Sequence, residues 1–349
     1  MKPSVNSLKN ETLQQPENVI SQADSSVGHE SFLAKEVSAT RFIKIIFLWV
    51  VAGAVLVVGV NLWIDIYGLF RPVSNRSLPV YYNERVSKYL LSKNYIPEKF
   101  NTVIVGTSLS ANLDISEFNN DQDKLKIYNA SLMGANISEL RPVADNLVEG
   151  GIKRMIICFS PYMIKNSGSK EVEFGPKLYI GALGSKNLLD TYIVGLIRHY
   201  DLMPAKFPRN QINEFGVNRF GDLYKVENVK EKIEKVIKAD KELTVDSIAL
   251  HELQLFIQKL KDEHIQFVGY FHPIPAEVLA SKRKEYEHFE HTVRQFVNDD
   301  NKLINFNTSE FEHFTTDYSN YIDHGHLSVK GQGILTKILV AEHTRRYPL

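Results

Sequence analysis

The sequence predicts a three-layer α/β sandwich with a mostly parallel sheet, preceded by one transmembrane helix and interrupted by a helical insertion. Three observations lead to this prediction. Short apolar runs alternate with segments of helical period over most of the chain. The runs are apolar at successive positions, which is typical of strands buried on both faces of a parallel sheet. Near the N-terminus, one uncharged apolar segment is long enough to cross a bilayer.

The composition excludes several classes of protein. The chain has 349 residues, and its 41 Lys and Arg balance 41 Asp and Glu, so its formal net charge is zero. Hydrophobic residues make up 44% and charged residues 23%, which are ordinary proportions for a globular protein. Because a nucleic-acid binder carries a basic surface, we expect no nucleic-acid partner. The single cysteine, Cys158, excludes an intrachain disulfide and a multi-cysteine metal site.

The N-terminal region divides into a tail and an apolar segment. Residues 1–40 are rich in Ser, Asn, Gln and Glu and carry few apolar residues, so we predict a disordered tail. Residues 41–65 contain Ile45–Ile64, an uncharged stretch that forms a helix of about 30 Å, the thickness of a bilayer core. The two tryptophans of the chain, Trp49 and Trp63, lie toward the ends of this stretch, where aromatic rings meet the membrane surface.

Basic residues around the apolar stretch predict its orientation. The stretch is closely preceded by Lys35, Arg41 and Lys44, and it is followed by Asp65, Arg71 and Arg76. Because Lys and Arg favour the cytoplasmic side, we expect a cytoplasmic tail, one span of the inner membrane, and a periplasmic domain over residues 66–349. The stretch is longer, and further from the N-terminus, than the apolar region of a usual signal peptide.

The remaining elements follow in chain order. Five apolar runs are predicted strands, at residues 102–106, 126–128, 154–159, 265–271 and 302–306. Amphipathic patterns predict helices at residues 138–148, 245–260, 275–297 and 328–343. Residues 163–243 interrupt the alternation with helical pieces at 188–200 and 226–237, which we interpret as an insertion packed over the sheet edge. Ligands of parallel sheets bind at the carboxyl ends of the strands, so the loops there are the places to search for a site.

Two of these loops carry residues suited to chemistry. The first strand runs into Gly106-Thr107-Ser108, which puts a hydroxyl at the turn into a helix. Ser108 is well placed as a nucleophile there, because the first N–H groups of a helix stabilise an oxyanion; alternatively, it only caps the helix. The second strand ends at Asn129 and is followed by Gly134. A glycine lets a backbone N–H approach a substrate oxygen closely, or it forms an ordinary turn.

A third group of candidates precedes the last helix. Asp323-His324-Gly325-His326 places a carboxylate and an imidazole three residues apart in a turn, so both can face one site. Histidine is the usual base for activating a serine, and a carboxylate orients it. The alternatives are a helix N-terminal Asp with a surface histidine, or a metal site built on these side chains. Because no further ligand motif completes a metal site, we expect neither metal nor cofactor.

The order of these motifs resembles the SGNH (GDSL-type) hydrolase superfamily over about residues 100–160 and 265–345. The motif ending in Ser108 is similar to the Gly-Asp-Ser block of the family, with Thr107 in place of Asp. Asn129 and Gly134 occupy the outer positions of its Asn-x-Gly-x-x-Gly block, in which Ser131 replaces the middle glycine. Asp323 and His326 match its last block, Asp-x-x-His. The Gly-x-Asn-Asp block is missing, because the third predicted strand is followed by Ser160-Pro161-Tyr162.

The resemblance implies an SGNH/flavodoxin-like fold and a role for each matching residue. Ser108 would be the nucleophile, His326 the base and Asp323 its orienting carboxylate. Gly134 would donate a backbone N–H to the oxyanion, and Asn129, in the same block, would also contact the oxyanion or substrate. Ser160 or Asn166 would replace the missing amide.

We also expect His272, at the end of the fourth strand, to reach substrate from the same rim; the alternative is a packed loop histidine. The insertion carries aromatic and cationic side chains that suit a glycan or form core: Tyr179, Tyr192, Arg198, Tyr200, Phe215, Arg219, Phe220 and Tyr224.

Membrane-anchored proteins of alginate O-acetylation and teichoic-acid D-alanylation are the relatives that this chain resembles, and they work beside membrane-bound O-acyltransferases. The resemblance therefore implies a serine acyl-esterase or O-acyltransferase that takes an acyl donor and acts on an envelope glycan. It also implies a membrane-bound O-acyltransferase as partner. The altered first and third blocks motivate an alternative, a non-catalytic scaffold or glycan-binding protein in an envelope-assembly complex.

Overall fold

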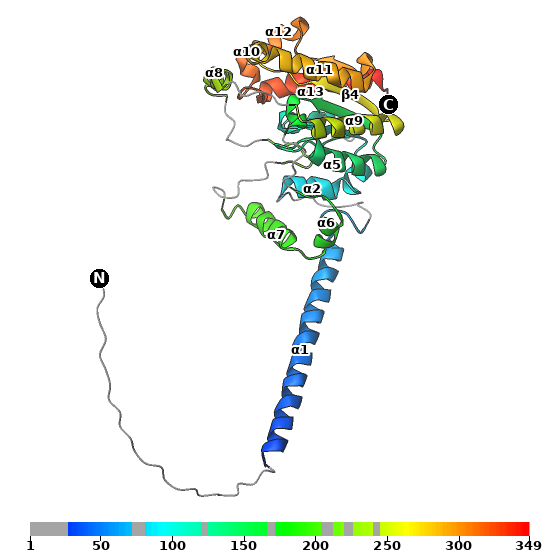
Figure 1. Ribbon diagram of the computed structural model, residues 1–349, viewed down its shortest axis with the longest axis vertical. Coiled ribbons are helices and arrows are strands. Elements are labelled where there is room, and N and C mark those ends of the chain that lie inside the picture. The colour runs from blue at the N-terminus through cyan, green and yellow to red at the C-terminus, as the bar shows by residue number, and fades with distance from the viewer. Residues whose placement is uncertain are drawn as a thin grey trace, which may run out of the picture. The chain divides into compact units, whose positions relative to one another are not determined.

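The computed structural model describes residues 27–71, 81, 83–119, 125–165, 172–203, 212–219, 226–239 and 245–348, with side chains from residue 39 onward (Figure 1). Val57 and the residues that follow it form one compact unit. The site and the surface discussed below both lie within this unit.

The first helix, α1, runs from Val27 to Ile64. Its part from Ala39 to Ile64 is long and apolar enough to cross a membrane, which is compatible with the predicted single-pass anchor. The helix begins before the predicted boundary, so residues 27–40 are helical rather than disordered. A helix formed in the apolar part can extend over these residues, because adding a residue to an existing helix costs little. Residues 1–26 lie outside the described residues.

The core of the unit is a parallel sheet in the order β2-β1-β3-β4-β5. Its strands match the five predicted runs to within a few residues and are β1 (Thr102–Val105), β2 (Ile127–Asn129), β3 (Arg154–Phe159), β4 (Gln266–Phe271) and β5 (Leu303–Asn305). Every neighbouring pair is parallel, so all strands end at the same edge of the sheet, which we call the carboxyl edge. The α/β class and the parallel sheet are as predicted.

Helices cover both faces of the sheet. Successive side chains of β3 alternate: Met155 and Ile157 belong to one apolar cluster, whereas Ile156 and Cys158 belong to the other. The first cluster includes buried residues of α5 (Ile137–Glu149), α9 (Ser247–Asp262) and α11 (Arg283–Val297). The second includes residues of α4 (Ser108–Ala111), α8 (Val229–Ala239), α10 (Ala276–Ser281) and α13 (Val329–Arg346). The result is consistent with a three-layer sandwich.

The other helices are short, and some predicted boundaries move. They are α2 (Glu84–Leu91), α3 (Tyr95–Lys99), α6 (Pro176–Gly181), α7 (Lys186–His199) and α12 (Glu312–Thr315). The single helix predicted over 275–297 is two helices, α10 and α11, which are separated at Lys282. Helix α9 is capped by Asp246, whose carboxylate accepts hydrogen bonds from the N–H groups of Ile248 and Ala249. The predicted insertion contributes α6, α7 and α8.

Candidate active site at the carboxyl edge of the sheet

Ser108 is the first residue of α4 and directly follows the turn that leaves β1. The cap of this helix is Thr107, whose hydroxyl accepts a hydrogen bond from the N–H of Leu109 at 3.4 Å. The helix-capping role considered for Ser108 is therefore filled by its neighbour. Gly106 is required in the turn, because a Cβ there would lie 2.3 Å from Ser110 Oγ and 2.6 Å from Cys158 Cβ. This close packing allows β1 to pass straight into the helix and leaves Ser108 half-buried at the edge.

Asp323 and His326 form a hydrogen-bonded pair in the loop before α13. His326 Nδ1 lies 2.8 Å from Asp323 Oδ2, and Asp323 Oδ1 accepts the backbone N–H groups of Gly325 at 2.9 Å and His326 at 2.8 Å. Burial alone would raise the pKa of the Asp323 carboxyl. The bonds from the imidazole and from the two N–H groups outweigh burial and hold that pKa well below its usual range. The carboxylate therefore stays charged and holds the ring in one orientation.

The loops that carry the three sequence blocks meet at this edge. Ala111 of α4 and Ile322, the neighbour of Asp323, are buried together, and Met133, the neighbour of Gly134, packs against them. A second contact joins the first and last blocks, because a Cβ on Gly325 would lie 3.2 Å from Leu109 Cδ2.

A hydrogen bond reinforces this contact, since Asn112 Nδ2 donates to the carbonyl oxygen of Leu327 at 2.8 Å. The residues on either side of His326 are thus tied to the helix that begins with Ser108.

Asn129 lies inside the protein rather than at the surface of the site. Its side chain is fully buried, its Nδ2 donates to the carbonyl oxygen of Ser110 at 2.8 Å, and its Oδ1 accepts the N–H of Ser131 at 3.1 Å. The amide therefore links α4 to the loop after β2. Asn129 is a positioning residue, and the expectation that it contacts substrate finds no support in this placement.

Gly134 lies at an exposed position of the loop after β2, with a φ of +64° that disfavours residues with a Cβ. The loop is held from below by an ion pair that the sequence analysis did not identify. Lys88 Nζ is buried, lies 3.1 Å from Glu84 Oε1 and donates to the carbonyl oxygen of Ser131 at 2.6 Å. Glu84 Oε2 accepts the N–H of Met133 at 3.0 Å. The i, i+4 spacing of Glu84 and Lys88 was the available signal, but the same spacing is common on exposed helix faces.

His272 supports the loop of the acid–base pair. It is 2% exposed, and its Nε2 donates to the carbonyl oxygen of Gly325 at 2.8 Å. Burial lowers the pKa of the imidazole to about 3, so the ring is neutral. On the other side of the ring, Nδ1 lies 4.0 Å from Cys158 Sγ. This placement fits the packed alternative considered for His272 and gives it a positioning role, while the residue also lines the cavity where β3, β4 and β5 end.

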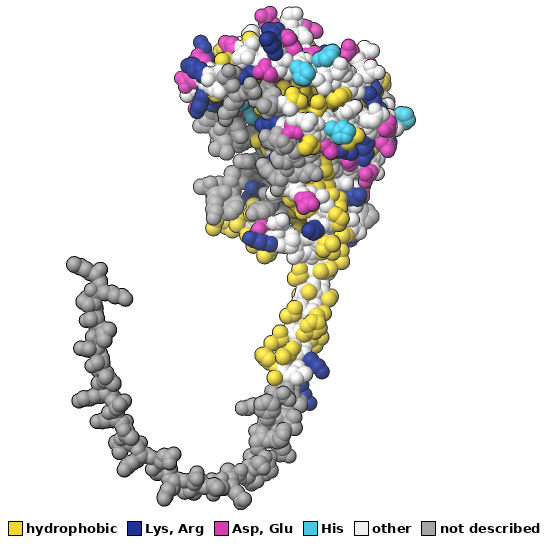
Figure 2. All heavy atoms as spheres, in the orientation of Figure 1, with side chains coloured by type: hydrophobic (Ala, Val, Ile, Leu, Met, Phe, Trp, Pro, Cys, Tyr) yellow, Lys and Arg dark blue, Asp and Glu magenta, His cyan; other side chains and the backbone are white. Residues whose placement is uncertain are grey.

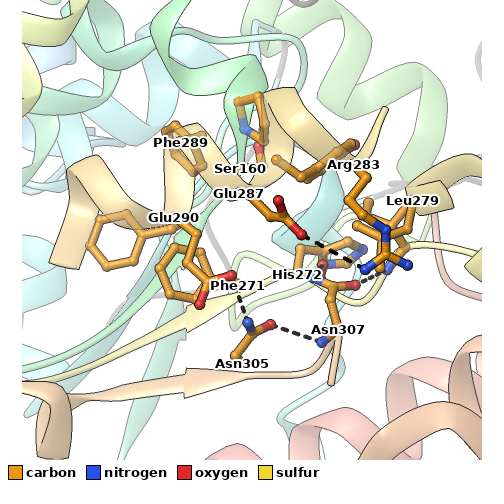
Figure 3. Close-up of a pocket in the computed structure, with 14 residues that line it drawn as sticks. Ser160, Phe271, His272, Leu279, Arg283, Glu287, Phe289, Glu290, Asn305 and Asn307 are labelled. Atoms are coloured by element: carbon orange, nitrogen blue, oxygen red, sulfur yellow. Dashed lines mark hydrogen bonds and ion pairs between the residues drawn. The ribbon is translucent and has the colours of Figure 1, made fainter. Parts of the chain in front are cut away.

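Ser160 lines a cavity of about 190 Å³ that lies where β3, β4 and β5 end (Figure 3). The hydroxyl of Ser160 is buried and has no hydrogen-bond partner within the described part of the chain. Polar side chains of α11 and of the end of β5 with the loop after it surround the cavity, and they include Arg283, Glu287, Glu290, Asn305 and Asn307. The third loop therefore offers one unpaired buried hydroxyl where the related family has an amide.

The other sequence expectations have mixed outcomes. Among the described residues, no group of three or more His, Cys, Asp or Glu side chains converges as a metal site would require. The aromatic side chains of the insertion contact separate elements instead of lining one cleft. Tyr179 lies beside Tyr89, and Tyr192 binds Asn61. Asn166, Phe220 and Tyr224 lie outside the described residues. Burial raises the pKa of the Cys158 thiol to about 12, as expected for a structural cysteine.

Comparison with known proteins adds little to this geometry. No family model matches the chain, and no curated protein matches it. One solved structure, provisionally described as a platelet activating factor from Streptococcus pneumoniae, is similar over 74% of this chain and 91% of its own length. Its sequence identity is 11% and its TM-score is 0.40. The function is therefore inferred from the residues of the site.

Proposed function

We propose that the protein is a membrane-anchored serine acyl-esterase or O-acyltransferase that acts on an extracytoplasmic polysaccharide or envelope glycan. One observation supports this most strongly. The Asp323–His326 pair is hydrogen-bonded in the arrangement of a catalytic acid–base pair, and its loop packs against the helix that begins with Ser108.

In the proposed mechanism, His326 Nε2 accepts the proton of Ser108 as Ser108 Oγ attacks the acyl carbonyl. Asp323 holds the imidazole and stabilises the positive charge that the ring gains. The backbone N–H groups of Ser108 and Gly134 bind the oxyanion, and loss of one such donor typically costs on the order of 100-fold in rate. The C–O bond to the leaving alcohol then breaks, and His326 returns the proton to that alcohol.

The acyl-enzyme is resolved by a second nucleophile. His326 removes a proton from water or from a glycan hydroxyl as that oxygen attacks the acyl carbonyl. The bond between the acyl carbon and Ser108 Oγ then breaks, and His326 returns the proton to Ser108. The acceptor alone separates esterase from acyltransferase chemistry. The Ser160 hydroxyl, which has no hydrogen-bond partner among the described residues, supplies a polar contact to the acyl donor on the side of the cavity after β3.

The membrane anchor supports the choice of substrate. With α1 across the inner membrane and its N-terminus in the cytoplasm, the folded unit is periplasmic, where envelope glycans are assembled. A membrane-bound O-acyltransferase that supplies acyl groups across the membrane is the partner that this arrangement suits.

A serine-directed fluorophosphonate probe tests the proposal on the full-length protein in detergent. We expect the wild type to be labelled and Ser108→Ala to be unlabelled and inactive on p-nitrophenyl acetate. Ser110→Ala is the matched control, since it removes another hydroxyl of the same helix and should keep the label. Thermal unfolding shows whether each variant is folded.

Two outcomes contradict the proposal. A folded Ser108→Ala variant that retains the label or the activity excludes Ser108 as the nucleophile. A folded wild type that is never labelled, yet retains an envelope glycan, favours the non-catalytic scaffold that the altered first and third blocks suggest.

A further inference from the structure

Exposed apolar side chains of the folded unit are concentrated in residues 180–203. Seven large apolar residues there are between 45% and 69% exposed: Ile180, Leu189, Ile193, Leu196, Tyr200, Leu202 and Met203. Elsewhere in the described part of this unit, beyond α1, such residues are scattered over other elements. Single exposed apolar residues are normal, but a contiguous group marks a surface that does not face water.

Helix α7 carries much of this surface and is apolar on two sides. Leu188, Thr191 and Val194 are buried against the body of the unit. The opposite side presents an exposed stripe with steps of four, three and four residues, made of Leu189, Ile193, Leu196 and Tyr200. Residues at this spacing share one face of a helix. We call these four residues the α7 stripe.

The turn between α6 and α7 contacts the end of α1 (Figure 1). Figure 2 shows the apolar side chains of α1 in yellow. Asn61 Nδ2 donates to the carbonyl oxygen of Leu183 at 2.8 Å, and Asn61 Oδ1 accepts the hydroxyl of Tyr192 at 3.2 Å. Gly184 packs closely on the same helix, because a Cβ on it would lie 3.3 Å from Val57 Cγ1. The amide of Asn61 is therefore satisfied by the turn, as a polar group within a lipid-facing helix must be.

These contacts fix the depth of the turn relative to the apolar segment. Asn61 stands three residues before Ile64, the last residue of the candidate span, and therefore about 5 Å inside its end. Val57 stands seven residues before Ile64 and therefore lies about 10 Å inside the same end of the candidate span. Helices that lie in the membrane interface bury their apolar face about 5–10 Å below the headgroup boundary. The turn that leads into α7 is thus at interfacial depth.

We propose that α7 is an interfacial helix whose stripe inserts into the same lipid leaflet from which α1 emerges. This inference rests on α1 being the membrane anchor of the proposed function. Lipid accounts for both the unpartnered stripe and the seating of the turn against a lipid-facing part of α1. Lys177 and Lys186 are exposed on α6 and at the start of α7, where their side chains can reach lipid phosphates. The folded unit is then held at the membrane surface by two elements, so its substrate must be reached there.

The depth of single labelled cysteines tests this inference on the full-length protein in vesicles of phosphatidylcholine and phosphatidylglycerol. Leu196→Cys reports on the stripe, Val55→Cys on α1, and Val329→Cys, which is 83% exposed on α13, on the aqueous side. Each is labelled with the fluorophore NBD and quenched by nitroxides on lipid acyl chains. The native Cys158 is buried, so the wild type gives the low background of labelling.

We expect the labels at positions 196 and 55 to emit at shorter wavelength and to be quenched severalfold more than the label at 329. A quenched label at 55 with a water-like label at 196 overturns the inference and leaves the anchor in place. Water-like labels at both positions would show that α1 does not lie in the bilayer and would contradict the membrane anchor. The Ser108→Ala variant tests the esterase chemistry separately. A shielded label at 196 that lipid nitroxides do not quench, or that forms a disulfide with a second copy, shows that protein covers the stripe and also overturns the inference.

Discussion

The carboxyl edge of the sheet and the α7 stripe depart from the usual distribution of side chains in opposite directions. At the edge, polar groups are buried: Lys88 is fully buried and His272 is 2% exposed. On α7, apolar groups are exposed, with Leu196 at 58%. Buried polar groups are the exception in proteins, and so are large contiguous apolar surfaces in water.

The buried polar groups at the edge have partners within the chain, whereas the exposed apolar groups of α7 have no covering partner among the described residues. The buried groups at the edge are paired within the chain, since Lys88 binds Glu84 and Ser131 and His272 binds Gly325. Their cost in desolvation is offset by hydrogen bonds that hold loops in place. No described residue covers the α7 stripe, and lipid is the compensation that we propose for it. Under the two proposals, the edge is arranged for chemistry and the stripe for contact with lipid.

The largest expected effect concerns the acid–base pair at the edge. Asp323→Asn keeps the shape of the side chain but can donate to His326 Nδ1, which would leave the proton on Nε2 and block its role as base. We expect the rate of ester hydrolysis to fall by about 10⁴-fold. Asp317→Asn is the control, because Asp317 is a solvent-exposed carboxylate paired with Lys330 and its loss should leave the rate unchanged. Unchanged hydrolysis in a folded Asp323→Asn variant would mean that the polar edge is only structural.

A smaller effect is expected in the pH dependence of stability. The unfolded chain protonates His272 below about pH 6.5, whereas the folded protein does so only near pH 3. The free energy of unfolding should therefore be greatest above pH 6.5 and fall as the pH drops toward 3, by up to about 4 kcal/mol from this residue. His343, whose pKa burial lowers to about 4, adds to the same slope.

His272→Asn should flatten this slope without removing it, because His343 remains. Urea unfolding of both proteins between pH 7 and pH 4 measures the difference. Parallel slopes for the two proteins would show that His272 is not held as a neutral buried ring.

The smallest expected effect is at Gly134. A Cβ has room there, since its nearest contact would be Arg85 Nη2 at 3.6 Å, but the φ of +64° strains any other residue. Gly134→Ala should therefore destabilise the protein by about 1 kcal/mol. Gly333→Ala in α13, where a Cβ meets no atom within 4 Å, should instead stabilise it by up to about 1 kcal/mol. Opposite shifts in the urea midpoints of the two variants would support the strain assigned to φ at Gly134. An unchanged urea midpoint for Gly134→Ala would show that the loop relaxes.

Patterns of near neighbours explain why much of the fold is predictable from the sequence. Strands buried on both faces appear as short apolar runs, so the positions of β1, β3 and β4 are evident. The pairing of Asp323 with His326 is also local, because only two residues of a turn lie between them. The split between α10 and α11 at Lys282 was not predicted, since the amphipathic pattern continues across it.

The roles of several side chains depend instead on contacts between distant parts of the chain. Asn129 and His272 were expected at the rim, but each binds a backbone carbonyl of another segment within the protein. The support of the Gly134 loop by Lys88 and the seating of Leu183 on Asn61 link segments that no local pattern connects. Such partners are specified only by packing.

By itself, the sequence determined the parallel α/β architecture, the apolar N-terminal helix and the local acid–base motif, because each depends on residue spacing within one segment. The tertiary structure alone decided the strand order, which polar side chains hold the site from beneath, and that an apolar stripe lies beside the end of α1. Those features arise when residues far apart in the chain pack together and form hydrogen bonds. The spacing of residues within one segment does not indicate such contacts.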